Sequence, residues 1–250
     1  MAGKLKGWRI AAVLTAGCGV FVGGFLIAAS VKTGLPPNEL VKLGVGMAQA
    51  RLSRHTVADR VASILRKKPG LREVARQAGG SLRILVFKSE RRVEVHAPGW
   101  EVPRVYPMTG FSGELGPKLQ EGDGQIPEGI YGIDFLNPNS NFYLSLKVSY
   151  PNAADRARAK ADGRTRLGGD IMIHGKNVTI GCIPIGDDAI EDVFYLVHAI
   201  GLKRVAVVIA PYDMCTGRNA DLERSPLAWY PALCDEIAHA LSRGISSPAN

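Results

Sequence analysis

The stretch "GGDIMIHGKNVTIGCIPI", residues 168–185, constrains the fold of this 250-residue chain more than any other segment. "DIMIH" and "VTIGC" are rich in apolar and β-branched residues and flank a polar turn sequence, which predicts two short strands. His174 ends the first strand, and Cys182 follows it by eight positions. We expect Gly175 to let the chain turn sharply, so that Cys182 returns beside His174.

A thiol beside an imidazole suits nucleophilic catalysis. A thiol attacks carbonyls only as the thiolate, and a neighbouring histidine can accept its proton and lower the cysteine pKa. Gly181 removes a side chain where a carbonyl must approach, so the backbone N–H groups of Gly181 and Cys182 are candidates for an oxyanion site. The spacing alone also fits two ordinary core residues. A zinc site is less favoured, because no Cys or His pair has compact ligand spacing.

The segments around this stretch predict a mainly β domain of the α+β class with peripheral helices. "NFYLSLKVSY", residues 141–150, alternates apolar and polar residues, as in a strand buried on one face. Residues 82–99 are typical of a hairpin that turns near residues 89–91, and residues 204–211 of a further strand.

Helices are expected on both sides of the strands. A helix after the cysteine begins with Asp187 or Asp188 as N-cap and ends at Gly201, and a last helix covers about residues 227–241. Further towards the N-terminus, Thr56 caps a helix that stops before Pro69.

Residues 1–30 predict a signal anchor. Three basic residues precede residues 10–30, which carry no charge and are long enough to cross a bilayer. This order predicts a single-pass protein of the inner membrane with its C-terminal part in the periplasm, and cleavage after residues 28–30 with release to the periplasm is the alternative.

Basic charge is concentrated at the front of the chain. Residues 1–80 carry 13 Lys or Arg against 3 Asp or Glu, whereas residues 81–250 carry 18 against 20. Residues 31–80 are therefore expected to form a basic helical stem, and no nucleic-acid-binding module is recognisable in the near-neutral remainder.

The cysteines outside the predicted span number three. Export exposes them to an oxidising compartment, where paired cysteines form disulfides. Cys215 and Cys234 can form a bridge that leaves Cys182 free, or can remain as buried apolar thiols.

Three separated motifs resemble one enzyme family. "GFSGELGPKLQEGDGQIPEGIYGI" (residues 110–133), "SYPNAADRA" (149–157) and "IMIHGKNVTIGCIPI" (171–185) resemble the YkuD-type L,D-transpeptidase catalytic domain and its YafK-like branch. The resemblance covers about residues 82–211. It implies a β-sandwich or barrel-like catalytic domain, here residues 81–245, that acts on peptidoglycan stem peptides without a metal or cofactor. It also implies Cys182 as nucleophile and His174 as general base, oriented by the carbonyl of Gly175.

The sequence departs from the wider family at two positions. Ile180 and Pro184 stand where a histidine and an arginine are common, so the substrate must be held differently. Thr179, Lys118 and Arg156 are candidates for that role, with surface or structural roles as the alternative for each.

The resulting hypothesis is a cell-wall L,D-transpeptidase that transfers an acyl group through a thioester to an amine. A peptidoglycan hydrolase with the same two residues and a non-catalytic wall-binding scaffold are the alternatives. The sequence does not determine the oligomeric state.

Overall fold

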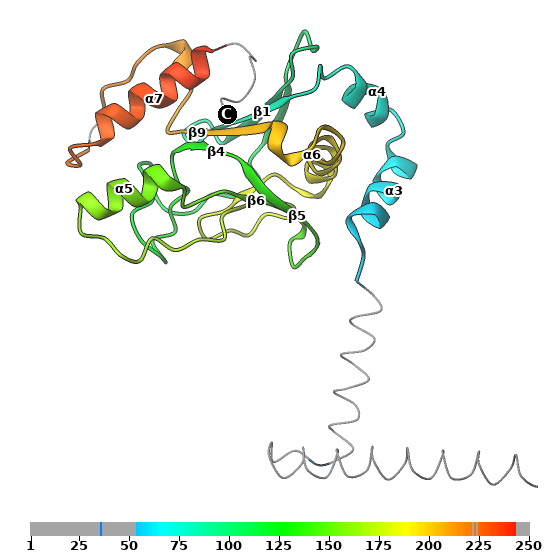
Figure 1. Cartoon of the computed structure of the whole chain (residues 1–250), viewed down its shortest axis with the longest axis horizontal. Helices are drawn as coiled ribbons and strands as arrows, with labels where there is room; N and C mark the ends of the chain where they lie inside the picture. Colours follow the sequence, from blue (N-terminus) through cyan, green and yellow to red (C-terminus); the bar gives the residue numbers. More distant parts are fainter. Residues whose placement is uncertain (1–35, 37–53, 222, 224, 244–250) are drawn as a thin grey trace, which may run out of the picture. The chain divides into compact units, whose positions relative to one another are not determined.

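The computed structural model describes residue 36, residues 54–221, residue 223 and residues 225–243 (Figure 1). The predicted membrane span at residues 10–30 and residues 31–35 and 37–53 of the predicted stem lie outside these residues. Within the described part of the chain, no helix has the length and apolar character needed to cross a membrane. The compact unit that contains the described strands begins at His55.

The elements follow one another along the chain from an N-terminal helical pair to a C-terminal helix. In order they are α3 (Val57–Lys67), α4 (Leu71–Arg76), β1 (Leu82–Phe87), β2 (Arg92–His96), β3 (Arg104–Pro107), β4 (Gly129–Tyr131), β5 (Ile133–Ser140), β6 (Tyr143–Val148), α5 (Ala153–Ala161), β7 (Met172–His174), β8 (Ile183–Pro184), α6 (Asp187–Ile200), η1 (Leu202–Arg204), β9 (Val205–Ala210), η2 (Met214–Thr216) and α7 (Tyr230–Ser242).

The strands form two sheets, so the predicted α+β class is confirmed. The first sheet has five strands in the order β3-β2-β1-β9-β4, and the second has four in the order β5-β6-β7-β8. The predicted hairpin is the antiparallel pair β1 and β2, and the chain turns there at Arg91, whose φ is 50°. β1 pairs with β9 in parallel, and so does β7 with β8.

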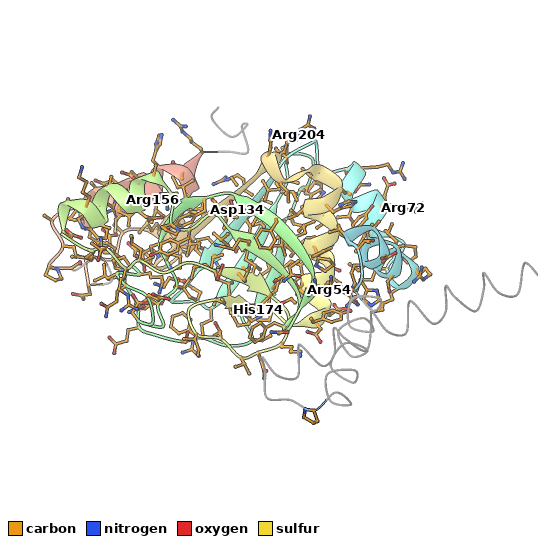
Figure 2. All side chains as sticks on the ribbon, turned by 60° about the horizontal axis from the view of Figure 1, so that its bottom comes forward. Arg54, Arg72, Asp134, Arg156, His174 and Arg204 are labelled. Atoms are coloured by element: carbon orange, nitrogen blue, oxygen red, sulfur yellow. The ribbon has the colours of Figure 1, made fainter. Side chains whose placement is uncertain are left out.

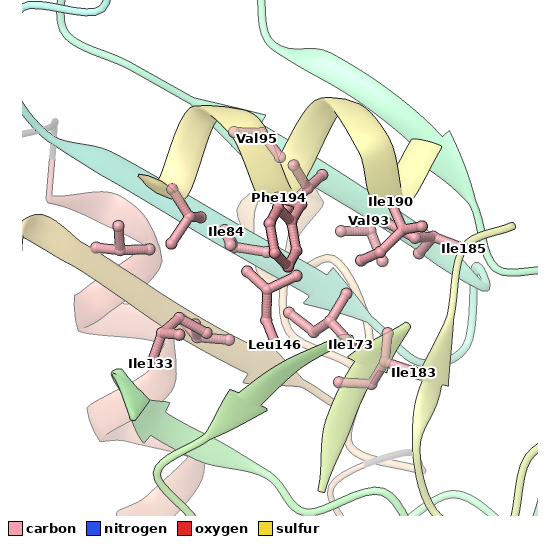
Figure 3. Packing of buried hydrophobic residues seen from close by; sticks show 14 of the residues in the cluster. Ile84, Val93, Val95, Ile133, Leu146, Ile173, Ile183, Ile185, Ile190 and Phe194 are labelled. Carbon is pink, nitrogen blue, oxygen red and sulfur yellow. The ribbon is translucent and has the colours of Figure 1, made fainter. Parts of the chain in front are cut away.

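Two apolar clusters flank the five-stranded sheet. The larger cluster fills the space between the sheets, where Phe194 and Ile190 of α6 contact side chains of both (Figure 3). The smaller cluster lies on the other face, where α7 covers β1 and β9 (Figure 1). Burying these side chains removes apolar surface from water and is the main stabilising contribution to the fold.

Helix α6 is a core helix, so the prediction that all helices are peripheral is wrong for this one. Nine consecutive residues, Ala189 to Val197, are buried, including Glu191 and Asp192. The helix is buried all round because the sheets and the α3–α4 pair surround it. Its N-cap is Gly186, and the predicted caps Asp187 and Asp188 lie in the first turn instead, where their charge suits the helix dipole.

Strand β6 is buried on both faces, although its alternating sequence predicted burial on one. Leu144, Leu146 and Val148 face the central cluster, as expected. Ser145 and Lys147 on the opposite face are also buried, with 1% and 9% exposure. The alternating sequence of β6 therefore gives the strand one apolar face and one polar face, and both faces are buried.

The N-terminal helices α3 and α4 belong to the same compact unit as the strands. The predicted N-cap Thr56 is confirmed, and it forms a capping box with Asp59. Lys67 and Lys68 at the end of α3 form ion pairs of 2.6 Å with Glu191 and 2.9 Å with Asp192 of α6. The last part of the predicted stem is thus attached to the core helix by charge.

Candidate active site

The register of β6, β7 and β8 places His174 in the smaller sheet, beside the strand that follows Cys182. His174 lies opposite Ser145 on β6 and opposite Pro184 on β8. Directly opposed residues share a face, and side chains alternate along a strand. His174 therefore shares a face with Pro184, whereas Ile183 is buried in the core, and Cys182 immediately precedes Ile183 in the chain.

His174 is buried and held in one orientation. Its exposure is 1%, and its ring lies 4.6 Å from the ring of Phe142. Nδ1 is 2.5 Å from the carbonyl oxygen of Gly175. Because a carbonyl only accepts, Nδ1 carries the proton in this contact, and Nε2 is left as the acceptor of the neutral ring.

The Nε2 atom of His174 is buried and has no hydrogen-bond partner among the described residues. Burial lowers the pKa of His174, against a smaller raising effect of the bond to Gly175. The ring is therefore predominantly neutral near pH 7, with Nε2 as an unoccupied acceptor.

Cys182 is partly exposed, so its sulfur is not sealed inside the domain. The thiol Sγ donates to the carbonyl of Asp170 at 3.5 Å and forms no hydrogen bond with His174. Burial raises the pKa of Cys182. The expectation of a cysteine pKa far below its free value is wrong for this resting arrangement, because desolvation outweighs the favourable charges.

The two backbone N–H groups expected at an oxyanion site are both engaged. Gly181 N donates to Ser112 Oγ at 2.7 Å, and Cys182 N donates to Thr179 Oγ1 at 2.8 Å. Thr179 Oγ1 also donates to the carbonyl of Cys182, which closes a tight turn before the cysteine. In this structure, side-chain hydroxyls occupy the positions that an oxyanion would take, so these amides become available only after those bonds open.

Glycine is needed at two positions of this loop for different reasons. Gly181 has a φ of +87°, and an added Cβ would lie 2.9 Å from the carbonyl oxygen of Gln125. Gly175 was expected to supply a sharp turn, but the residue with positive φ is Lys176, at 58°. A Cβ on Gly175 would instead lie 2.5 Å from Asp187 Oδ1, so close packing explains this glycine.

The segment of residues 110–128 covers the cysteine loop. Ser112 links the two, because its hydroxyl donates to the carbonyl of Gly124 while accepting from Gly181. Asp123 organises the segment by accepting backbone N–H groups of Leu119 and Gln125. The first motif of the sequence thus supports the loop that carries the nucleophile candidate.

The proposed substrate-binding residues lie in different surroundings. Lys118 is buried and forms a 2.6 Å ion pair with Asp123, which neutralises its charge within the covering segment. Arg156 is exposed on α5, away from His174 (Figure 2). Thr179 is at the site, but its hydroxyl is engaged with Cys182.

Lys147 lies on the face of the candidate site without having been predicted there. Lys147 lies opposite Met172, on the same face as His174. Alternation in residues 141–150 grouped Lys147 with Ser145, but only the strand register shows that this polar face is the face of the site. Ile180, at a position that departs from the wider family, is 79% exposed, whereas Pro184 is buried.

Cys215 and Cys234 are free thiols, so the alternative of a bridge between them is wrong. Cys234 is buried in the smaller apolar cluster, whereas Cys215 is exposed in η2. Across the described ranges, no group of three or more His, Cys, Asp or Glu side chains could hold a metal ion.

Comparison with known families identifies the family of the domain. A family model described as the YkuD L,D-transpeptidase catalytic domain matches residues 81–209, from before β1 to the end of β9. The chain belongs to the YkuD L,D-transpeptidase family. Members of the family act on peptidoglycan, and the matched residues include all three motifs singled out in the sequence.

Relatives of this YkuD chain include YafK of Escherichia coli K12, which carries the provisional name of an L,D-transpeptidase. The two are 34% identical over 155 residues, which cover 58% of this chain and 61% of YafK, less than two thirds of its length.

Solved structures show weaker likeness. The helical cell shape determining protein Pgp2 of Campylobacter jejuni is 23% identical, with a TM-score of 0.41 over 60% of this chain and 57% of Pgp2. Bd1075 of Bdellovibrio bacteriovorus is also 23% identical, with a TM-score of 0.38 over 54% of this chain and 49% of Bd1075.

Proposed function

We propose that this protein is a cell-wall L,D-transpeptidase with Cys182 as nucleophile and His174 as general base. One observation carries the proposal: the buried Nε2 of His174 is an acceptor without a partner among the described residues, on the strand that pairs with β8 directly after Cys182. A buried polar atom without a partner is unfavourable, and such atoms are concentrated at functional sites. Catalytic hydrogen bonds are commonly longer in structures without substrate and tighten when it binds.

The proposed reaction has two half-reactions. Nε2 takes the thiol proton as Sγ attacks the carbonyl carbon of the third stem residue, and the C–N bond to the terminal D-amino acid then breaks. The departing amine takes the proton from His174, which leaves a thioester on Cys182. In the second half-reaction, an amine of another stem attacks the carbonyl carbon of the thioester. His174 removes a proton from this amine and returns it to Sγ, which leaves as the thiol.

The engaged amides fit a site that becomes complete when substrate binds. A carbonyl oxygen that enters beside Cys182 must replace Thr179 Oγ1 or Ser112 Oγ as the acceptor of a backbone N–H.

The cellular location of the protein is part of the same proposal. Residues 10–30 anchor the chain in the inner membrane, and the catalytic domain reaches peptidoglycan in the periplasm. Cell fractionation of the full chain, with recovery in the inner-membrane fraction expected, tests this location.

Incubation of the purified protein with tetrapeptide muropeptides tests the activity. We expect cross-linked dimers joined between third residues in the wild type, none in Cys182→Ala, and an unchanged yield in the control Cys215→Ala. A carbapenem, which this family is expected to accept, should add covalently to Cys182 as seen by intact-mass spectrometry.

Other outcomes separate the alternatives. Trimmed monomers without dimers would identify a hydrolase that uses water as acceptor. Absence of both products and adduct would overturn the catalytic proposal and favour a wall-binding scaffold.

A further inference from the structure

We propose that Lys147 is a positioning residue whose positive charge supports the anionic form of the Cys182 sulfur. This inference rests on the proposed role of Cys182 as nucleophile. Lys147 lies opposite Met172 in the ladder between β6 and β7, two positions along β6 from the partner of His174. The backbone of Met172 in turn contacts the sulfur of Cys182 and lowers its pKa.

Lys147 is a buried cation without a counter-ion among the described residues. Its exposure is 9%, and Nζ donates to the carbonyls of Val148 at 3.1 Å and Tyr150 at 3.2 Å. Among the residues that the structure describes, no carboxylate lies within ion-pair distance of this ammonium group. An ammonium has three donors, so at least one remains for another acceptor.

The two other buried lysines among the described residues each have a carboxylate partner. Lys88 is paired with Glu128 at 2.8 Å, and Lys118 is paired with Asp123 at 2.6 Å. Burying an unpaired charge costs free energy, and proteins usually supply a partner, as they do at Lys88 and Lys118. The absence of a carboxylate at Lys147 leaves its charge available to a neighbouring group that becomes negative.

The charges around Cys182 shift the pKa of its thiol in opposite directions. Burial and the carboxylate of Asp170 raise the pKa of Cys182, whereas Lys147 and Lys118 lower it. Lys118 is neutralised by Asp123, and the neighbouring His174 is predominantly neutral, so Lys147 is the cation here without a counter-charge. The charge of Lys147 therefore opposes the desolvation that keeps the thiol protonated.

In the proposed step, the S–H bond breaks, the proton moves to Nε2 of His174, and the sulfur keeps the electron pair. The resulting thiolate is a new negative charge in a partly buried place. A fixed cation nearby stabilises this charge without reorganising, because backbone carbonyls already hold Nζ.

Alkylation of the full chain by iodoacetamide tests this proposal without a peptide substrate. The rate at Cys182 is followed between pH 5 and pH 10 by peptide mass mapping, with the exposed Cys215 as an internal reference. We expect Lys147→Gln, which can keep donors towards the two carbonyls, to lower the rate at Cys182 about tenfold at pH 7, equivalent to about one pKa unit. Lys147→Arg should restore most of the rate, and Lys160→Gln, an exposed lysine on α5, should match the wild type.

A second measurement on the wild type covers the case in which Lys147→Gln does not fold. The rate with anionic iodoacetate relative to neutral iodoacetamide should be higher at Cys182 than at Cys215, because a fixed cation attracts the anionic reagent. Unchanged pH profiles in a folded Lys147→Gln protein, or equal reagent ratios at both cysteines, would overturn the role of Lys147. Neither result depends on transpeptidase activity, so failure of this proposal is separable from failure of the proposed function.

Discussion

The two sheets of this domain differ in whether the buried charged and polar side chains beside them have partners. Beside the larger sheet, Lys88 and Glu128 are both completely buried, and every strong donor or acceptor around them is used. Lys88 Nζ donates to Glu128 and to the carbonyls of Gly116 and Ile126, while the second carboxylate oxygen accepts from Tyr230. On the outer face of the smaller sheet, within the part of the chain that the structure describes, Lys147 has no carboxylate partner and His174 Nε2 has no hydrogen-bond partner.

This difference separates scaffold from site. The Lys88 group joins β1, the covering segment and α7, so its completeness holds three parts of the chain together. The group around Cys182 includes an acceptor, His174 Nε2, without a partner among the described residues, and under the proposed function the thiol proton would fill this position. We therefore expect substitutions in the first group to change stability and those in the second to change chemistry.

The largest expected effect is on turnover at the incomplete site. His174→Gln removes the proposed base and should lower turnover by about 10²- to 10⁴-fold, the usual contribution of general base catalysis. The measurement is the rate of muropeptide conversion, with urea unfolding of the same sample. The matched control His198→Gln, an exposed histidine on α6, should keep full activity, and a His174→Gln enzyme within about threefold of wild type would remove His174 from the reaction.

The next effect is on stability at the complete group. Lys88→Met leaves Glu128 buried without its cation and should lower the free energy of unfolding by about 3–5 kcal/mol, as when a buried ion pair loses one member. Urea denaturation at neutral pH measures this loss. Lys147→Met orphans no carboxylate and should cost clearly less, so similar losses in the two variants would break the contrast between the sheets.

The smallest effect is expected outside both groups. Arg156→Ala removes an exposed side chain on α5 and should change stability by no more than about 0.5 kcal/mol, as is usual for surface positions. Its KM for muropeptides should match that of Lys160→Ala on the same helix. A selective rise in KM for Arg156→Ala would instead show that substrate extends to α5 and that the incomplete site is larger than the face of β6 to β8.

Prediction from the sequence worked best where local pattern and tertiary environment agree. The capping box at Thr56, the β1–β2 hairpin and the apolar alternation of β6 depend on neighbours within a few residues and are all present. The prediction of peripheral helices failed at α6, because a helix with one clear apolar stripe gives no signal that other elements also cover its polar side. The prediction that β6 is buried on one face only was wrong for the same reason, because its sequence gives no signal that other elements cover the polar face.

The candidate site shows the same division. His174 and Cys182 could be selected from residue types and spacing, but the cysteine pKa could not, because burial depends on the covering segment. Ser112 and Lys147 carried no local signal. Ser112 contacts the cysteine loop across 69 positions, and only the strand register shows that Lys147 shares a face with His174.

By itself, the sequence predicted several of the strands and helices, the family and two candidate residues for thiol chemistry, because these follow from local pattern and from matching motifs. Only the tertiary structure decided which polar groups are buried and which lack a partner. Desolvation and ion pairing depend on atoms brought together from distant parts of the chain, and they distinguish Lys88, which is paired with a carboxylate, from Lys147, which has none among the described residues.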